Sequence, residues 1–131
     1  MPDPASRAPQ ESREPRISRR VLVVEDHNDS AQALARLLAL DGHKTRIAAT
    51  LADAQRLCTD EKFDVILCDL GLPDGNGLDL ASTARVACPA ARLIAVTGHG
   101  MTQDLKAIEA AGFDGHVLKP FTIESLLRQL K

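Results

Sequence analysis

Short apolar runs rich in β-branched residues alternate with segments of helical periodicity from residue 20 to the end of the chain. Continuous apolar runs of this length are typical of strands that are buried on both faces of a sheet. They lie at 21–24, 65–68 and 93–96, and a weaker strand is expected at 45–48 and a short one at 115–118. Each run is followed by a segment in which apolar residues recur at helical spacing. Strands that alternate with helices in this way predict βαβ crossovers, and therefore an α/β fold with a parallel sheet covered by helices on both faces.

Capping residues and helix-ending residues predict the limits of these helices. The expected N-caps are Asn28 or Asp29, Thr50, Thr102 and Thr122, and the expected ends are Gly42, Cys88-Pro89 and Gly112. The inward side of the first helix is expected to carry Ala33, Leu34, Leu37, Leu38 and Leu40, and that of the fourth helix Leu105, Ile108 and Ala111. The segment 71–77, rich in Gly, Pro and Asp, is expected to form a loop after the third strand.

The first 18 residues differ sharply from the rest in composition. They are rich in Pro, Ser, Arg and Glu and almost lack apolar residues. Such a segment cannot bury enough surface to offset the entropy lost on ordering. We therefore expect a disordered tail or linker at 1–18 and a single domain at 19–131.

Charge and hydropathy exclude several classes of function. The net charge of −2 argues against nucleic-acid binding, which needs a concentrated basic surface. No apolar run approaches the ~20 residues that cross a bilayer, and the start of the chain lacks the apolar core of a signal peptide. We therefore expect a cytoplasmic protein without membrane insertion. The three cysteines match no metal-site or disulfide spacing, so they are expected to be reduced and buried.

Reactive side chains stand at the ends of four of the five predicted strands. The first run ends at Glu25-Asp26 and the third at Asp69, while the fourth and fifth end at Thr97 and Lys119. Ligands of open parallel sheets lie beyond the carboxyl ends of the strands, so these side chains are expected to converge there.

This set of side chains suits a cation with an anion beside it. Close carboxylates repel each other by about 4 kcal/mol per pair at ~4 Å and an effective dielectric of ~20, and a bound cation relieves that repulsion. Oxygen ligands favour Mg²⁺, and a backbone carbonyl such as that of Gly71 would supply a further oxygen. Lys119 and Thr97 suit contacts with a phosphoryl group, for which Asp69 is the candidate nucleophile.

Around these positions the chain resembles the receiver domains of two-component response regulators. The matching segments are 21–26, 65–77, 95–98 and 118–120, and the resemblance covers about residues 18–131. It implies the flavodoxin-like strand order 2-1-3-4-5. It also implies that Glu25, Asp26 and Asp69 serve Mg²⁺ and that Asp69 is the phosphorylation site. Thr97 and Lys119 would then contact the phosphoryl group, and the Lys119-Pro120 bond is expected to be cis.

The resemblance further implies how the domain works. Phosphoryl groups would come from a histidine kinase or a histidine phosphotransfer domain. The domain would catalyse its own phosphotransfer and autodephosphorylation, and it would not be an enzyme acting on external substrates. It would signal to an unknown output partner through the face formed by about residues 102–131.

Three positions depart from the common pattern of the family and leave their roles open. Many members carry Tyr or Phe three residues before the lysine, and this chain has His116. Either His116 acts as a switch coupled to Thr97, or it merely fills the position. Gly71 and His99 lie two residues beyond Asp69 and Thr97, where the resemblance implies that they flank the incoming water and tune dephosphorylation. Gly71 leaves space there, and His99 either orients the water or simply lies in solvent.

Other interpretations of the same fold are weaker. A nucleotide- or flavin-binding enzyme would need a glycine-rich turn where Glu25-Asp26 stands, and the chain lacks the Tyr and Trp that usually stack on flavin. A phosphatase-like hydrolase would need a general acid where Gly71 stands. A receiver-like domain that binds partners without phosphorylation stays as the alternative. The last predicted helix ends the given sequence, and we expect either a stand-alone regulator or a receiver from a hybrid kinase; the sequence around residues 111–120 favours the latter.

Overall fold

A parallel sheet forms the centre of the computed structural model, which describes residues 18–98, 105–119 and 121–130. Its strands are β1 (Arg20–Val24), β2 (Lys44–Ala48), β3 (Val65–Asp69), β6 (Arg92–Thr97) and β7 (Gly115–Leu118). They pair in the order β2-β1-β3-β6-β7, which is the expected order 2-1-3-4-5 when the strands of this sheet are counted along the chain. All neighbouring pairs are parallel. The predicted flavodoxin-like α/β fold is confirmed, and every strand begins and ends within one residue of its expected limits.

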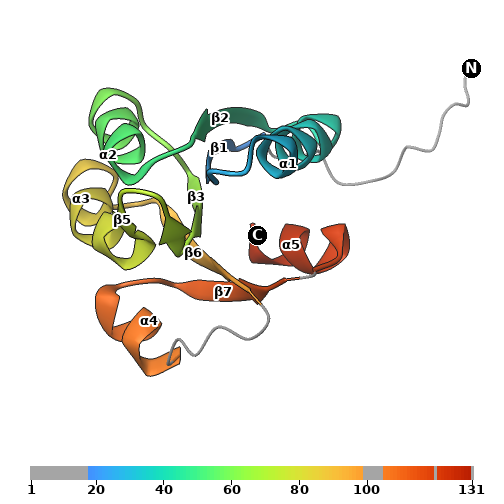
Figure 1. Ribbon diagram of the computed structural model, residues 1–131. Coiled ribbons are helices and arrows are strands. Elements are labelled where there is room, and N and C mark those ends of the chain that lie inside the picture. The colour runs from blue at the N-terminus through green and yellow to red at the C-terminus, as the bar shows by residue number, and fades with distance from the viewer. Residues whose placement is uncertain (1–17, 99–104, 120, 131) are drawn as a thin grey trace, which may run out of the picture.

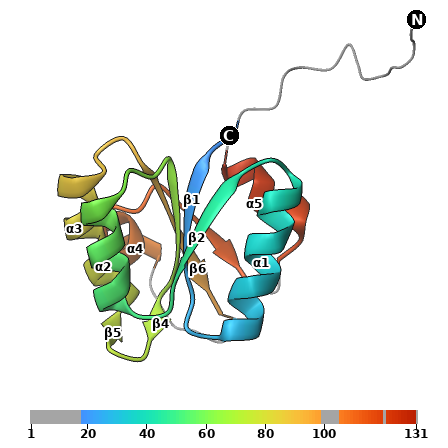
Figure 2. The same cartoon turned by 90° about the horizontal axis from the view of Figure 1, so that it is seen from above.

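Helices cover both faces of this sheet (Figure 1). They are α1 (Asn28–Leu40), α2 (Leu51–Asp60), α3 (Leu80–Ala87), α4 (Leu105–Ala111) and α5 (Ile123–Gln129). Seen from above, α1 and α5 lie on one side of the sheet and α2, α3 and α4 on the other (Figure 2). The strand side chains alternate between two separate apolar cores, one under each helical layer. Because both faces are covered, the central strands β1, β3 and β6 carry continuous apolar runs, whereas the edge strands β2 and β7 also carry polar residues.

Two helix starts follow the capping residues as predicted. The Thr50 hydroxyl accepts a hydrogen bond from the Asp53 N–H (3.0 Å) at the start of α2. The Thr122 hydroxyl accepts one from the Ser125 N–H (3.1 Å) at the start of α5. Each bond satisfies an N–H that has no partner within the helix. The expected cap at Thr102 falls outside the described residues.

The start of α1 differs from its prediction, whereas two helix ends agree with theirs. Residue His27 occupies the N-cap of α1 and makes no capping bond through its side chain, so the expected cap at Asn28 or Asp29 is wrong. The glycines that follow α1 and α4, Gly42 and Gly112, adopt φ of 92° and 107°. These are left-handed conformations, which glycine adopts at little cost when a helix ends.

The buried side of α1 agrees only in part with the prediction, which was right for Leu34 and Leu38 and wrong for Ala33, Leu37 and Leu40. The residues that face the sheet are Ala31, Ala35 and Leu38, with Leu34 partly buried beside them. The small alanines let the helix approach the sheet closely. The helix is rotated about its axis so that these alanines face the sheet, and the other apolar residues therefore face the solvent. Ala33 and Leu37 are exposed, and Leu40 has 75% of its surface exposed. Leu105 of α4 is likewise 54% exposed, although Ile108 is buried as predicted.

The predicted loop after β3 contains a small hairpin. Strands β4 (Gly71–Leu72) and β5 (Gly75–Asn76) pair in antiparallel fashion, and the 3₁₀ helix η2 (Gly77–Asp79) follows. Strands of two residues are too short to show any period in a sequence, so only the turn was predictable. This hairpin matters for the site because it begins two residues after Asp69.

Candidate functional site

The predicted site residues stand together at the carboxyl edge of the sheet. Glu25 and Asp26 follow β1, Asp69 and Thr97 are the last residues of β3 and β6, and Lys119 follows β7. Parallel strands all end at the same edge, so residues far apart in sequence meet there. The expected convergence is therefore present in the structure.

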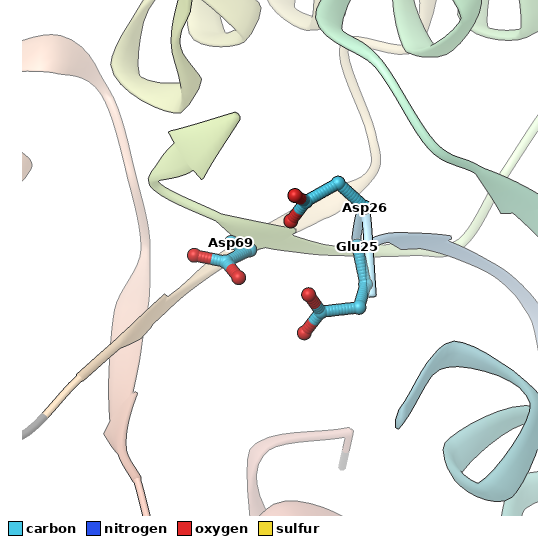
Figure 3. Close-up of side chains that lie close together, drawn as sticks. All are labelled: Glu25, Asp26 and Asp69. Atoms are coloured by element: carbon cyan, nitrogen blue, oxygen red, sulfur yellow. The ribbon is translucent and has the colours of Figure 1, made fainter. Parts of the chain in front are cut away.

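Three carboxylates form the acidic part of this edge. Glu25, Asp26 and Asp69 each offer an oxygen, and these oxygens lie within 4.8 Å of one another. Figure 3 shows the three carboxyl groups gathered at the ends of β1 and β3. Oxygen ligands at this spacing have the chemistry that Mg²⁺ and Ca²⁺ prefer. The donor set therefore fits the expected cation.

Lys119 links two of these carboxylates. Its Nζ lies 3.0 Å from Glu25 Oε1 and 3.3 Å from Asp69 Oδ2. Partial burial lowers the pKa of Lys119, but the hydrogen bonds and charges of the two carboxylates outweigh burial and raise the pKa above its ordinary value. The ammonium is therefore held in its charged form beside the candidate nucleophile.

Glu25 is the buried member of the cluster, with only 8% of its surface exposed. Burial raises its pKa, and the Asp69 charge adds to this rise. Hydrogen bonds from Lys119 and from the His27 N–H (3.2 Å to Oε2) oppose the rise without cancelling it. The charged form of this side chain is thus costly here, as expected for a carboxylate placed to receive a cation.

Asp69 is oriented by its neighbours along the chain. Its Oδ1 accepts a hydrogen bond from the Gly71 N–H at 3.0 Å, while Oδ2 faces Lys119. A side chain at position 71 would meet only Asp69 Oδ1, at 4.0 Å, so the space beside the carboxylate is open. A cavity of about 560 Å³ also reaches Asp69, Glu25 and Lys119, with an apolar wall that includes Leu34 and Phe121.

Thr97 and His116 lie on one face of the sheet. Thr97 is 6% exposed, and its carbonyl accepts a hydrogen bond from the Lys119 N–H (2.7 Å). In the β6–β7 register, His116 pairs with Ala95 and Leu118 pairs with Thr97. Paired residues of neighbouring strands point to the same face, so His116 shares the face of Thr97, where its side chain is exposed. The switch role of His116 stays a prediction.

Some sequence predictions fall on residues outside the description. These are the water-tuning role expected for His99, the cis bond expected at Pro120, and most of the tail or linker expected at 1–18, of which only Ser18 is described. The expected output face at 102–131 is described in part. Its residues Lys106, Glu109, Glu124 and Arg128 are exposed.

Sequence reasoning missed two residues that shape the site. A Cβ on Gly77 would lie 2.5 Å from the Asp69 carbonyl oxygen and 2.9 Å from Cys68 Sγ, so this glycine allows the loop to fold back against the end of β3. Asp74, at the tip of the hairpin, accepts hydrogen bonds from the start of α2. The glycine at position 77 was a visible signal for close approach, whereas the Pro-Asp-Gly segment around Asp74 indicated only a turn.

Fold and site together define a doubly wound α/β protein with an acidic edge suited to a hard cation. The chain belongs to the response regulator receiver domain family, whose model matches residues 21–131. No helix among the described residues is long and apolar enough to cross a membrane.

Individual relatives support this assignment. The transcriptional regulatory protein KdpE of Mycobacterium tuberculosis is 32% identical over 111 residues, which cover 85% of this chain and 49% of KdpE. The virulence sensor protein BvgS of Bordetella bronchiseptica is 30% identical over 134 residues, covering 97% of this chain and 11% of BvgS. The chain thus spans about half of one relative and a small part of the other.

Solved structures show the same fold. A response regulator from Burkholderia pseudomallei, with a phosphorylated aspartic acid, a calcium ion and citrate, matches with a TM-score of 0.81 and 32% identity, over 87% of this chain and 67% of that one. The receiver domain of the sensor histidine kinase PA1611 from Pseudomonas aeruginosa has a magnesium ion in its active-site cleft. It matches with a TM-score of 0.78 and 25% identity, over 87% of this chain and 95% of that one.

Proposed function

We propose that this receiver domain accepts a phosphoryl group on Asp69 and changes its contacts with partner proteins in response. One observation carries the proposal: a carboxylate with open space beside it lies against both an acidic cluster and the Lys119 ammonium. Phosphoryl transfer needs a positioned nucleophile and positive charge around the phosphoryl oxygens. A receiver-like domain that binds partners without phosphorylation would not require all of these groups to lie together.

Mg²⁺ is the proposed cofactor. Carboxylate oxygens of Glu25, Asp26 and Asp69 would hold it, with the backbone carbonyl of Gly71 as a further ligand. When bound, the ion would neutralise negative charge on the phosphoryl oxygens. The magnesium ion in the PA1611 receiver domain supports this choice.

The residues of the chain suit nucleophilic transfer from a phosphohistidine of a histidine kinase or a histidine phosphotransfer domain. A carboxylate oxygen of Asp69 bonds to phosphorus while the bond from phosphorus to the imidazole nitrogen breaks, and the imidazole departs with the electron pair. The product is an acyl phosphate. Lys119 then exchanges its contact with Asp69 for one with a phosphoryl oxygen, and the Thr97 hydroxyl donates to another.

Loss of the phosphoryl group returns the domain to its starting state. A water molecule attacks phosphorus, the bond to the Asp69 oxygen breaks, and inorganic phosphate leaves. Gly71 leaves room for that water, and His99 is the proposed residue that tunes its approach. The domain is therefore proposed to act once on itself in each cycle, in the cytoplasm, and not as an enzyme for external substrates.

The proposed output runs through β7 and its neighbours toward the face at about residues 102–131. Thr97 and His116 lie on the same face of the sheet, so a movement of Thr97 toward the phosphoryl group could be transmitted to His116. Replacing His116 with Phe tests this step. Phosphorylation-dependent partner binding that is identical in H116F and wild type at about pH 6 and pH 8, on either side of the ordinary histidine pKa, would exclude a switch role for the imidazole.

The decisive experiment is phosphorylation by a small-molecule donor. The protein is incubated with acetyl phosphate with and without Mg²⁺, and its intact mass is recorded with rapid sampling. We expect one phosphoryl increment that requires both Mg²⁺ and Asp69, with D69N as the control. No increment under any condition would favour the alternative, a receiver-like domain that binds partners without phosphorylation.

A further inference from the structure

Asp74 connects the hairpin after the phosphoacceptor strand to a helix on another part of the chain. Its Oδ1 accepts a hydrogen bond from the Leu51 N–H at 2.7 Å, and its Oδ2 accepts one from the Ala52 N–H at 3.0 Å. These two N–H groups belong to the first residues of α2. Both bonds lower the pKa of Asp74, so the carboxylate is charged at neutral pH.

The start of α2 is therefore capped by two separate chain segments. Thr50, the local N-cap, accepts the Asp53 N–H, and Asp74 accepts the two N–H groups before it. A helix needs partners for these N–H groups, but they need not come from a distant loop. Here the loop that supplies two of the three also contains Gly71, the residue proposed to contact the metal.

The hairpin has a second contact with α2 and a firm base. A Cβ on Gly75 would lie 2.9 Å from Leu51 Cδ2, so the tip of the hairpin packs directly on the helix. At the base, the Gly77 N–H donates to the Leu70 carbonyl at 2.9 Å. Figure 2 shows β4 and β5 beside one end of α2, and the contacts of Asp74 identify this end as the start of the helix. Between tip and base lies the pair Gly71–Asn76, whose position depends on both attachments.

We propose that Asp74 is a positioning residue, which fixes the β4–β5 hairpin to α2 and thereby sets the place of Gly71 beside Asp69. Gly71 acts on the site in two ways. Its N–H orients the Asp69 carboxylate through a 3.0 Å hydrogen bond, and its carbonyl is the proposed metal ligand. The part of this inference that concerns Mg²⁺ rests on the proposed function; the part that concerns the hairpin does not.

A matched pair of variants separates positioning from helix stability. D74A removes the link between the hairpin and α2. T50A removes the other cap of the same helix end and leaves the hairpin untouched, so it controls for loss of α2 stability. D74N keeps one acceptor oxygen and should restore part of the function lost in D74A.

Two measurements on the full chain test the proposal. Amide hydrogen exchange of residues 71–76 in metal-free protein reports how firmly the hairpin is held. Mg²⁺ titration followed by amide chemical shifts reports the dissociation constant. We expect D74A to lose exchange protection in the hairpin and to bind Mg²⁺ about tenfold more weakly, the lower end of what loss of a ligand-orienting partner costs. D74N should fall between D74A and wild type, and T50A should stay near wild type in both measurements.

The outcomes distinguish this inference from the proposed function. Equal effects of D74A and T50A on hairpin exchange, or no effect of D74A, would overturn the positioning role. A wild-type protein that binds no Mg²⁺ would refute the proposed metal site, while hairpin exchange would still decide whether Asp74 holds the loop. If D74A frees the hairpin yet binds Mg²⁺ as wild type does, the claim that Asp74 acts on the metal through Gly71 is wrong.

Discussion

Replacing Lys119 with glutamine is expected to make the stability of the domain depend more strongly on Mg²⁺ than it does in wild type. In the wild-type structure the Lys119 ammonium lies 3.0 Å from a Glu25 oxygen and 3.3 Å from an Asp69 oxygen. K119Q removes this internal cation and leaves the acidic cluster without its counter-charge. A bound divalent ion would then be the main cation that relieves the repulsion among the carboxylates.

The size of the loss follows from these distances and from exposure. At about 3 Å and an effective dielectric of ~20, each charge pair is worth about 5 kcal/mol before any cost is subtracted. The Lys119 side chain is 37% exposed, so water screens both pairs, and K119Q also avoids the cost of partly burying the ammonium. The net loss should therefore lie between that of a surface pair and that of a buried pair, about 1–2 kcal/mol in the free energy of unfolding.

Urea unfolding measured by far-ultraviolet circular dichroism, with and without Mg²⁺, tests this expectation. The chain has no Trp or Tyr, so intrinsic fluorescence is not a useful probe. Saturating Mg²⁺ stabilises any protein that binds it only when folded, by about 2.7 kcal/mol at a concentration of 100 times the dissociation constant. We expect this increment to be larger in K119Q than in wild type. K44Q, which removes an exposed lysine of β2, is the matched control for net charge.

Acidity provides an independent check. The pKa of Glu25 is higher in the folded protein than in the unfolded chain, so protonation of Glu25 favours folding. This contribution to stability is fully present below the pKa of the unfolded chain and is lost as the pH rises through the pKa of the folded protein. Without Lys119 that pKa should rise further, so the deficit of metal-free K119Q should be smaller near pH ~4.5 than at neutral pH. The reasoning is refuted if K119Q and K44Q lose equal stability, or if Mg²⁺ stabilises K119Q no more than wild type.

Three other expectations concern packing and titration. G77A should lower the free energy of unfolding by about 1–3 kcal/mol, because its Cβ would meet the Asp69 carbonyl oxygen at 2.5 Å; unchanged urea unfolding would contradict this close approach. Burial raises the pKa of Asp114, but bonds from a backbone N–H and an arginine outweigh it and lower the pKa. The stability that they contribute should be lost as the pH falls below about 4, and a D114N variant should lack this loss in acid unfolding curves. Burial raises the pKa of Cys58 to about 12 and also raises the pKa of Cys68. A thiol reagent should therefore label neither of these two residues in folded protein, whereas it should label all three cysteines of the chain in urea. Rapid labelling of Cys58 or Cys68 in folded protein would disprove their burial.

Much of the fold was readable from the sequence because the central strands β1, β3 and β6 each carry their own apolar signal. A run such as Val65 to Cys68 is apolar throughout, and this pattern indicates a strand with both faces covered, whatever its neighbours are. The ends of the strands were equally visible, since Asp69 and Thr97 interrupt apolar runs. Because parallel strands end at one edge, the candidate site could be assembled before its geometry was known.

Sequence patterns were less informative where two different arrangements of the folded chain would be compatible with the same local pattern of residues. Helix α1 carries more apolar residues than one face can hold, and Ala31 and Ala35 face the sheet while Leu37 and Leu40 face outward. The choice depends on how closely the helix can approach the sheet, which is a property of both surfaces. The role of Asp74 was hidden for a related reason, because its partner Leu51 lies 23 residues earlier in the chain.

The sequence by itself determined the class of this protein, the limits of its strands and the residues that stand at the carboxyl edge. These follow from local hydrophobic period and from the direction that parallel strands share. Only the tertiary structure decided that Lys119 pairs with Glu25 as well as Asp69, which side of α1 is buried, and that the hairpin is fixed to α2. Each of these depends on distances between atoms from separate elements, and such distances are set by packing and not by any short stretch of chain.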